Sequence, residues 1–114
     1  MRSITARLTD AKNYARAAAG YVKGIGLAQF SGDSLRQHAV CFCLVVVGEA
    51  CMEVSRGLSE RAPEIPWAAI EGMRNILVHE YWQIDEEIVY NVARDDAEVL
   101  AAWLDRLLEE IQVA

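Results

Sequence analysis

The side chains best suited to chemistry lie close together in one segment, RNILVHEYW at residues 74–82. Arg74 offers a planar cation that can donate paired hydrogen bonds to an anionic group. His79, five residues later, carries an imidazole, a group that gives or takes a proton near neutral pH. Together the two could bind an anion and transfer a proton beside it. We therefore take Arg74 and His79 as candidate catalytic residues.

Hydrophobic spacing predicts that this segment is helical, which fixes the direction of each side chain. With 100° of rotation per residue, Arg74 and Tyr81 lie within about 40° of Ile70 on the apolar face. His79 lies about 180° from Ile70, so it points away from the core. Asn75 precedes His79 by one turn, and we expect its amide to hydrogen-bond the imidazole. The plainer alternatives are a surface histidine and a core tyrosine.

An arginine on the apolar face needs a partner, because an unpaired buried guanidinium is costly. Glu49 is the only charged residue between Ala39 and Met52, which makes it the candidate partner. We therefore predict a buried ion pair between Arg74 and Glu49. Such a pair could support a functional site or could be purely structural, and the sequence leaves both interpretations open.

The elements that position these residues are all predicted to be helices. The chain is rich in Ala, Leu and Glu and contains only 7 Gly and 2 Pro, which favours helix over strand. Apolar periodicity and capping residues predict five helices in chain order. They lie at about 3–25, at about 33–58, from near Pro66 through 74–82, at 83–94 and at 95–111. Asp85 and Asp95 are the expected N-caps of the last two. The 114 residues thus predict one domain, a compact all-α bundle of about five helices.

The predicted helix at 33–58 is apolar on nearly every side between Ala39 and Met52. Such a helix must be covered all round, and a bundle of this size does not readily do that alone. We therefore expect a homodimer with this helix near a two-fold seam.

Three cysteines, Cys41, Cys43 and Cys51, sit in or beside the same apolar run. They lack the spacing of a zinc site, so we expect reduced core thiols of a cytoplasmic protein, with no metal and no cofactor. The longest apolar run has ten residues, which is too short to cross a bilayer. No membrane segment is predicted.

The net charge of −6 argues against nonspecific nucleic-acid binding, but the charge is unevenly spread. Residues 1–23 carry five basic residues and one acid, whereas residues 80–114 carry ten acids and two arginines. Lys12, Arg16 and Lys23 fall on one face of the first predicted helix. This face is either an ordinary solvated surface or a stripe that follows a phosphate backbone.

The segment at 74–82 contains the pattern Arg-x4-His-x-Tyr, which resembles the signature of the HepT-like branch of the HEPN superfamily. Two longer blocks agree with it. VVVGEA at 45–50 is similar to the family's IGEA segment, and PEIPWAAIEGMRNILVHEYW at 63–82 is similar to its central block. The similarity covers roughly residues 30–95 in recognisable order.

The resemblance implies a small dimeric bundle in which Arg74 and His79 of both protomers line one cleft. It implies a metal-independent ribonuclease, often the toxin of a type II toxin–antitoxin pair whose antitoxin is a minimal nucleotidyltransferase. The antitoxin would transfer AMP from ATP onto Tyr81. In RNA cleavage His79 would transfer protons, Arg74 would stabilise the phosphorane, and Asn75 would orient His79 or contact phosphate.

A second function, from a different class, is a non-catalytic helical partner that binds and regulates a nucleotidyltransferase. In that case Arg74 and Glu49 would only hold the dimer together. An unrelated dimeric bundle would require the motif to be accidental.

Overall fold

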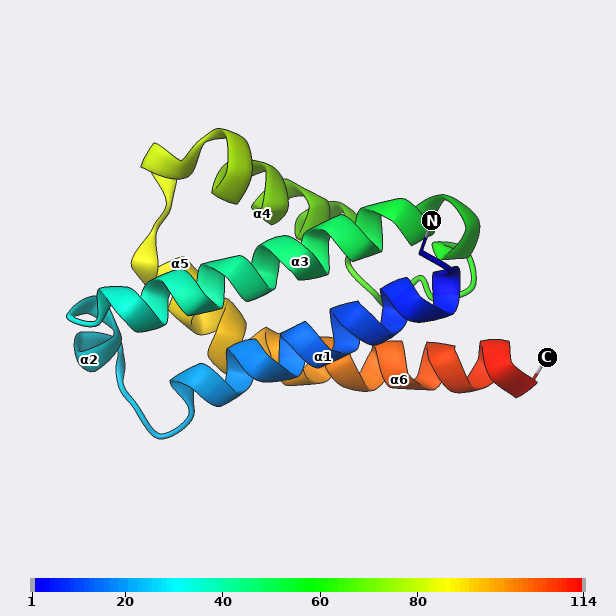
Figure 1. Ribbon diagram of the computed structural model, residues 1–114, viewed down its shortest axis with the longest axis horizontal. Coiled ribbons are helices and arrows are strands. Elements are labelled where there is room, and N and C mark those ends of the chain that lie inside the picture. Colours follow the sequence, from blue (N-terminus) through cyan, green and yellow to red (C-terminus); the bar gives the residue numbers. More distant parts are fainter. Residues whose placement is uncertain (1, 114) are drawn as a thin grey trace.

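The computed structural model describes residues 2–113, which form an all-helical bundle (Figure 1). Its helices are α1 Ile4–Val22, α2 Leu27–Ser31, α3 Ser34–Leu58, α4 Trp67–His79, α5 Glu86–Asn91 and α6 Ala97–Val113. A 3₁₀ turn follows α4 at Tyr81–Gln83, and a π-helical turn at Val92–Asp96 joins α5 to α6. The predicted all-α bundle is confirmed.

The helices lie in the spatial order α4, α3, α1, α6, with each one packed against the next (Figure 1). Because α4 turns back along α3, its main contacts with the rest of the bundle are with α3. A groove of about 350 Å³ separates α4 from α6. Ile70 and Met73 line it from α4, and Val99 and Trp103 line it from α6. The position of α4 therefore depends on how it meets α3.

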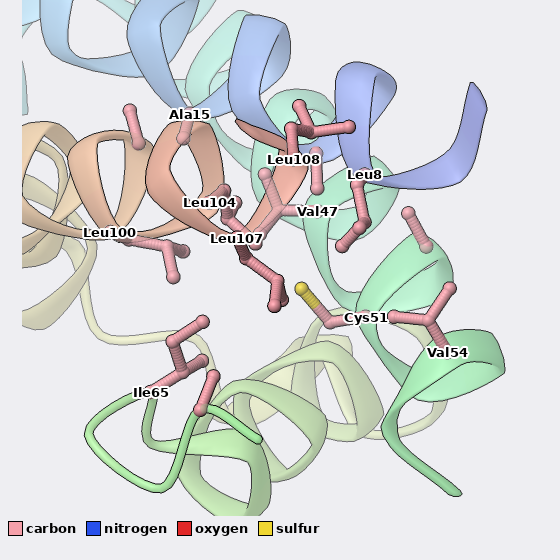
Figure 2. Packing of buried hydrophobic residues seen from close by; sticks show 14 of the residues in the cluster. Leu8, Ala15, Val47, Cys51, Val54, Ile65, Leu100, Leu104, Leu107 and Leu108 are labelled. Carbon is pink, nitrogen blue, oxygen red and sulfur yellow. The ribbon is translucent and has the colours of Figure 1, made fainter. Parts of the chain in front are cut away.

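Two clusters of buried side chains fill the bundle. The first joins α1, α3 and α6, with Leu8 and Leu104 fully buried among its members (Figure 2). The second gathers around Phe30 and Val40. The Tyr90 ring packs against Phe30, and its hydroxyl donates a hydrogen bond of 2.6 Å to the Ile25 carbonyl. This bond satisfies the polar tip of a buried aromatic residue.

The observed starts of α1 and α3 agree with the sequence prediction. Ser3 accepts a hydrogen bond from the Ala6 amide at 3.1 Å, and Asp33 accepts one from the Arg36 amide at 3.0 Å. The short helix α2 is not among the predicted helices. It is only five residues long, and the fully buried Phe30 anchors it to the core.

The predicted break between two helices at 94 and 95 is wrong. Asp85 does cap α5, since its carboxylate accepts hydrogen bonds from the amides of Glu87 and Ile88. Asp95 caps nothing, because the backbone stays helical through the π turn, and its carboxylate binds the Arg94 side chain at 2.7 and 2.8 Å. The two predicted helices are one helix with a π-helical turn in it.

The apolar helix α3 contributes buried side chains to both clusters. Cys43 and Cys51 are buried as predicted, Cys41 is half-buried, and all three thiols are free. By length and composition alone α3 could cross a membrane, but 44% of its most apolar stretch of 18 residues is buried inside the bundle. Helices of similar length and composition also form the cores of soluble proteins.

Candidate active site

The two predicted partners Glu49 and Arg74 meet where α4 packs on α3. The Arg74 Nε donates a hydrogen bond of 2.6 Å to the Glu49 Oε1, and Nη2 donates to the same oxygen. The predicted ion pair is therefore present. It is not buried, because the Arg74 side chain is 17% exposed and that of Glu49 is 49% exposed. An ion pair this open to solvent contributes about 0–1 kcal/mol, so it orients Arg74 more than it stabilises the fold.

The other end of the guanidinium faces two residues of its own helix. Nη1 donates a hydrogen bond of 2.9 Å to the Asn75 Oδ1 and lies 3.4 Å from the His79 Nε2. When Nη1 donates to that nitrogen, the imidazole is neutral and carries its proton on Nδ1. Glu49, Arg74, Asn75 and His79 therefore form one connected cluster, which we call the Arg74 cluster.

The predicted hydrogen bond between Asn75 and His79 is absent, and Arg74 binds to both instead. The long Arg74 side chain reaches around α4 from the apolar face, a path that angles around the helix axis do not describe. His79 is exposed, in agreement with its predicted direction away from the core.

Electrostatically, the cluster combines one cation, one carboxylate, one amide and one imidazole. An arginine has five N–H donors, and Glu49, Asn75 and His79 engage four of them. An anion that binds this guanidinium through two hydrogen bonds must therefore displace one of these partners. The arrangement can place a phosphate oxygen beside a proton-transfer group.

Tyr81 lies beyond the end of α4, in the 3₁₀ turn. The prediction that it continues the apolar face of the helix is therefore wrong. Tyr81 and Trp82 are each 68% exposed. The two rings meet edge to face, with centroids 5.5 Å apart. The plainer alternative of a core tyrosine is thus wrong.

A residue that sequence reasoning did not place at the site is Gly48, which lies directly against Arg74. The available signal was a glycine inside a predicted helix, next to the candidate partner Glu49.

Two of the three cations on the basic face of α1 share one carboxylate. Lys12 and Arg16 both approach the Asp105 carboxylate on α6, at 3.3 and 3.6 Å. Lys23 is exposed just after the end of α1. These contacts favour a structural role for the stripe over one in following a phosphate backbone.

Within residues 2–113, no three His, Cys, Asp or Glu side chains gather as metal ligands would. Burial raises the pKa of the Cys51 thiol to about 12 and also raises the pKa values of Cys41 and Cys43. These thiols are core groups and take no part in the Arg74 cluster.

Over most of its length the chain is similar to a ribonuclease family and to proteins named as putative or probable ribonucleases. The family model described as "Ribonuclease HepT-like" matches residues 11–107. A protein of Methanocaldococcus jannaschii named "Putative RNase" is 30% identical over 95 residues, which cover 83% of this chain and 87% of that protein. A protein of Thermococcus cleftensis named "Probable ribonuclease HepT" is 28% identical over 87 residues, which cover 76% of this chain and 79% of that protein.

No solved structure matches the chain significantly. The match to the family model nevertheless spans α2 to α5 completely, and it includes every member of the Arg74 cluster. This protein belongs to the HepT-like ribonuclease family.

Proposed function

We propose that this protein is a metal-independent endoribonuclease and the toxin of a type II toxin–antitoxin pair in the cytoplasm. The observation that carries the proposal is the Arg74 cluster, in which Nη1 of Arg74 lies 3.4 Å from Nε2 of an exposed histidine. A phosphate held by the guanidinium would sit beside the imidazole. Family membership supports RNA as the source of that phosphate.

The active form is a homodimer, which brings two Arg74 clusters to one cleft. On α3, Leu35 is 82% exposed and Phe42 is 60% exposed in the single chain. A second copy would remove these apolar side chains from water, which favours association. The dimer also supplies two histidines, one for each proton transfer.

Cleavage follows from the chemistry of the cluster. One His79 takes the proton of the RNA 2′-hydroxyl, whose oxygen attacks the adjacent phosphorus. The bond from phosphorus to the 5′-oxygen breaks, and the other His79, in its protonated form, gives that oxygen a proton. Arg74 stabilises the extra negative charge on the phosphorane. The products are a 2′,3′-cyclic phosphate and a 5′-hydroxyl, and no metal takes part.

Neutralisation acts through Tyr81. The cognate minimal nucleotidyltransferase presents ATP, and the Tyr81 hydroxyl oxygen attacks its α-phosphorus while pyrophosphate leaves and the phenolic proton is lost. The 68% exposure of Tyr81 supports access for such an enzyme. AMP on Tyr81 adds a bulky anion close to the Arg74 cluster, where it would compete with RNA for the guanidinium.

The test incubates the purified protein with 5′-labelled single-stranded RNA in the presence of EDTA. Cleavage that persists with EDTA, with a cyclic phosphate on one product and a 5′-hydroxyl on the other, supports the proposal. Products with 3′-hydroxyl ends, or loss of activity on chelation, contradict the mechanism. A dimer that cleaves no RNA yet binds its nucleotidyltransferase would point to the alternative function, a non-catalytic partner subunit. In this alternative Glu49 and Arg74 would have a structural role, and their contact joins α3 to α4 within one chain.

A further inference from the structure

Helix α4 crosses α3 at a point where α3 has no side chain. A Cβ atom built on Gly48 would overlap the Arg74 Cβ and would lie 2.7 Å from its Cγ and 3.5 Å from its Cα. Ordinary contacts between such atoms are 3.4 Å or longer. The atoms that block this space are Cβ and Cγ, the start of the Arg74 side chain, and a change of rotamer does not clear them because it leaves Cβ in place. The two helices approach this closely only because residue 48 is glycine.

The same close approach builds the Arg74 cluster. Gly48 directly precedes Glu49, so one turn of α3 provides both the space for the Arg74 stem and the carboxylate that binds its guanidinium. The Arg74 Nε lies 2.6 Å from the Glu49 Oε1, so this hydrogen bond depends on the separation of the two helices. A separation of the helices by about 1 Å would lengthen this hydrogen bond beyond good geometry. Misplacement by about 1 Å is enough to cost an active site much of its rate.

We propose that Gly48 is a positioning residue, whose missing side chain seats α4 on α3 and so sets the direction of the Arg74 guanidinium at the active site. The proposal rests on the proposed ribonuclease function for its effect on cleavage. Its geometric part, the link between residue 48 and the Arg74 side chain, stands independently of that function.

The chain offers two matched controls. Gly57 lies on α3 and Gly72 lies on α4, and a Cβ built on either meets no atom within 4 Å. Gly→Ala in a helix raises helix propensity at all three positions. A loss seen only for Gly48→Ala must therefore come from its contact with Arg74.

The first measurement follows the Arg74 Nε–H signal in ¹H–¹⁵N spectra of the full chain, assigned by its disappearance in Arg74→Lys. In the wild type this proton is held by Glu49, so its exchange with water is slow. We expect Gly48→Ala to shift the signal and to speed its exchange at least tenfold, while Gly57→Ala and Gly72→Ala leave it unchanged. An unchanged signal in folded Gly48→Ala overturns the proposal.

The second measurement is the cleavage of single-stranded RNA of mixed sequence. We expect Gly48→Ala to cleave at least tenfold more slowly than the wild type and the two controls to cleave normally. Equal cleavage by Gly48→Ala overturns the proposal and leaves the ribonuclease function intact. When the wild type itself cleaves nothing but Gly48→Ala still shifts the Arg74 signal, the ribonuclease function fails and the positioning role stands.

A third comparison covers the case in which Gly48→Ala folds but is too unstable for the first two measurements. Arg74→Gly removes the Cβ and Cγ that the new methyl group would strike. In the Arg74→Gly background, we expect Gly48→Ala to leave the melting temperature unchanged or higher. A fall as large as in the wild-type background would show that the contact with Arg74 is not the cause, and it would overturn the proposal.

Discussion

Nη1 of Arg74 lies 3.4 Å from Nε2 of His79, although the two residues start from different faces of α4. The contact depends on the length of the arginine side chain, which begins on the apolar face and ends at the exposed edge of the helix. Glu49 holds the guanidinium there from α3. The two groups to which we assign anion binding and proton transfer are thus already in contact, and a phosphate that takes two hydrogen bonds from Arg74 would have to displace one of its present partners.

His79→Ala is expected to lower the rate of RNA cleavage by about 10²–10⁴-fold, because this range is typical of the loss of a general acid or base. The side chain is exposed, so thermal unfolding should stay unchanged. The measurement is the initial rate on labelled RNA, with a circular dichroism melt of the same sample.

His38→Ala provides the control for this prediction. His38 is the other histidine of the chain and is exposed on α3. It should cleave RNA at the wild-type rate. Normal cleavage by His79→Ala in a folded dimer would refute the enzyme mechanism.

Glu49→Gln tests whether the carboxylate orients Arg74 or stabilises the fold. The side chain is 49% exposed, so we expect a change in the free energy of unfolding below about 1 kcal/mol. Cleavage should nevertheless fall, because the guanidinium loses its charged partner on α3. Glu53→Gln, at an exposed position one turn further along α3, is the matched control and should affect neither quantity. Strong destabilisation by Glu49→Gln with full residual activity would favour a purely structural pair.

Tyr81→Phe separates cleavage from neutralisation. We expect this variant to cleave RNA normally, because the ring is exposed and the hydroxyl takes no part in the proposed proton transfers. It should resist its nucleotidyltransferase, since the attacking oxygen is gone. Intact-mass spectrometry after incubation with the transferase and ATP checks the prediction. Tyr21→Phe, at another exposed tyrosine, should still gain AMP; modification of Tyr81→Phe would place the acceptor elsewhere.

The cysteines should differ in their reactivity with iodoacetamide. Burial raises the pKa of Cys51 to about 12, so near pH 8 almost none of this thiol is in the reactive thiolate form. Cys41 is only half-buried, and we expect it to be labelled first. Raising the pH from 8 to 10 should speed the labelling of Cys41 and leave Cys51 unlabelled until a denaturant is added. Peptide mass spectrometry measures both sites, and equal labelling of the two in the native protein would contradict this assignment.

Sequence patterns predicted those parts of the site that depend on one helix or on charge counting. Glu49 was identifiable because it is the only charge in a long apolar stretch, and His79 because helical rotation carries it off the apolar face. The hydrogen bond predicted between Asn75 and His79 failed because rotation angles describe where side chains start and not where a long one ends. A glycine inside a predicted helix was visible at position 48, but its close approach to Arg74 was not predictable, since the distance between two helices is not encoded in the periodicity of either.

The same limit explains the two aspartates predicted to cap helices. Both Asp85 and Asp95 precede good helix-forming residues, but only Asp85 stands where the backbone enters a helix from an extended conformation. A cap needs free amides ahead of it, and at Asp95 the preceding residues are already helical. The local sequence does not distinguish a helix start from a π turn.

Asp85→Ala and Asp95→Ala test this distinction directly. Asp85→Ala removes the acceptor for the Glu87 and Ile88 amides and should cost about 1 kcal/mol, equivalent to a fall of roughly 4 °C in melting temperature. Asp95→Ala loses only an exposed contact with Arg94 and should melt within about 1 °C of the wild type. Thermal unfolding followed by circular dichroism compares the two. An equal fall for both variants would mean that Asp95 does cap a separate helix, because a solvent-exposed contact with its sequence neighbour cannot contribute as much as an N-cap.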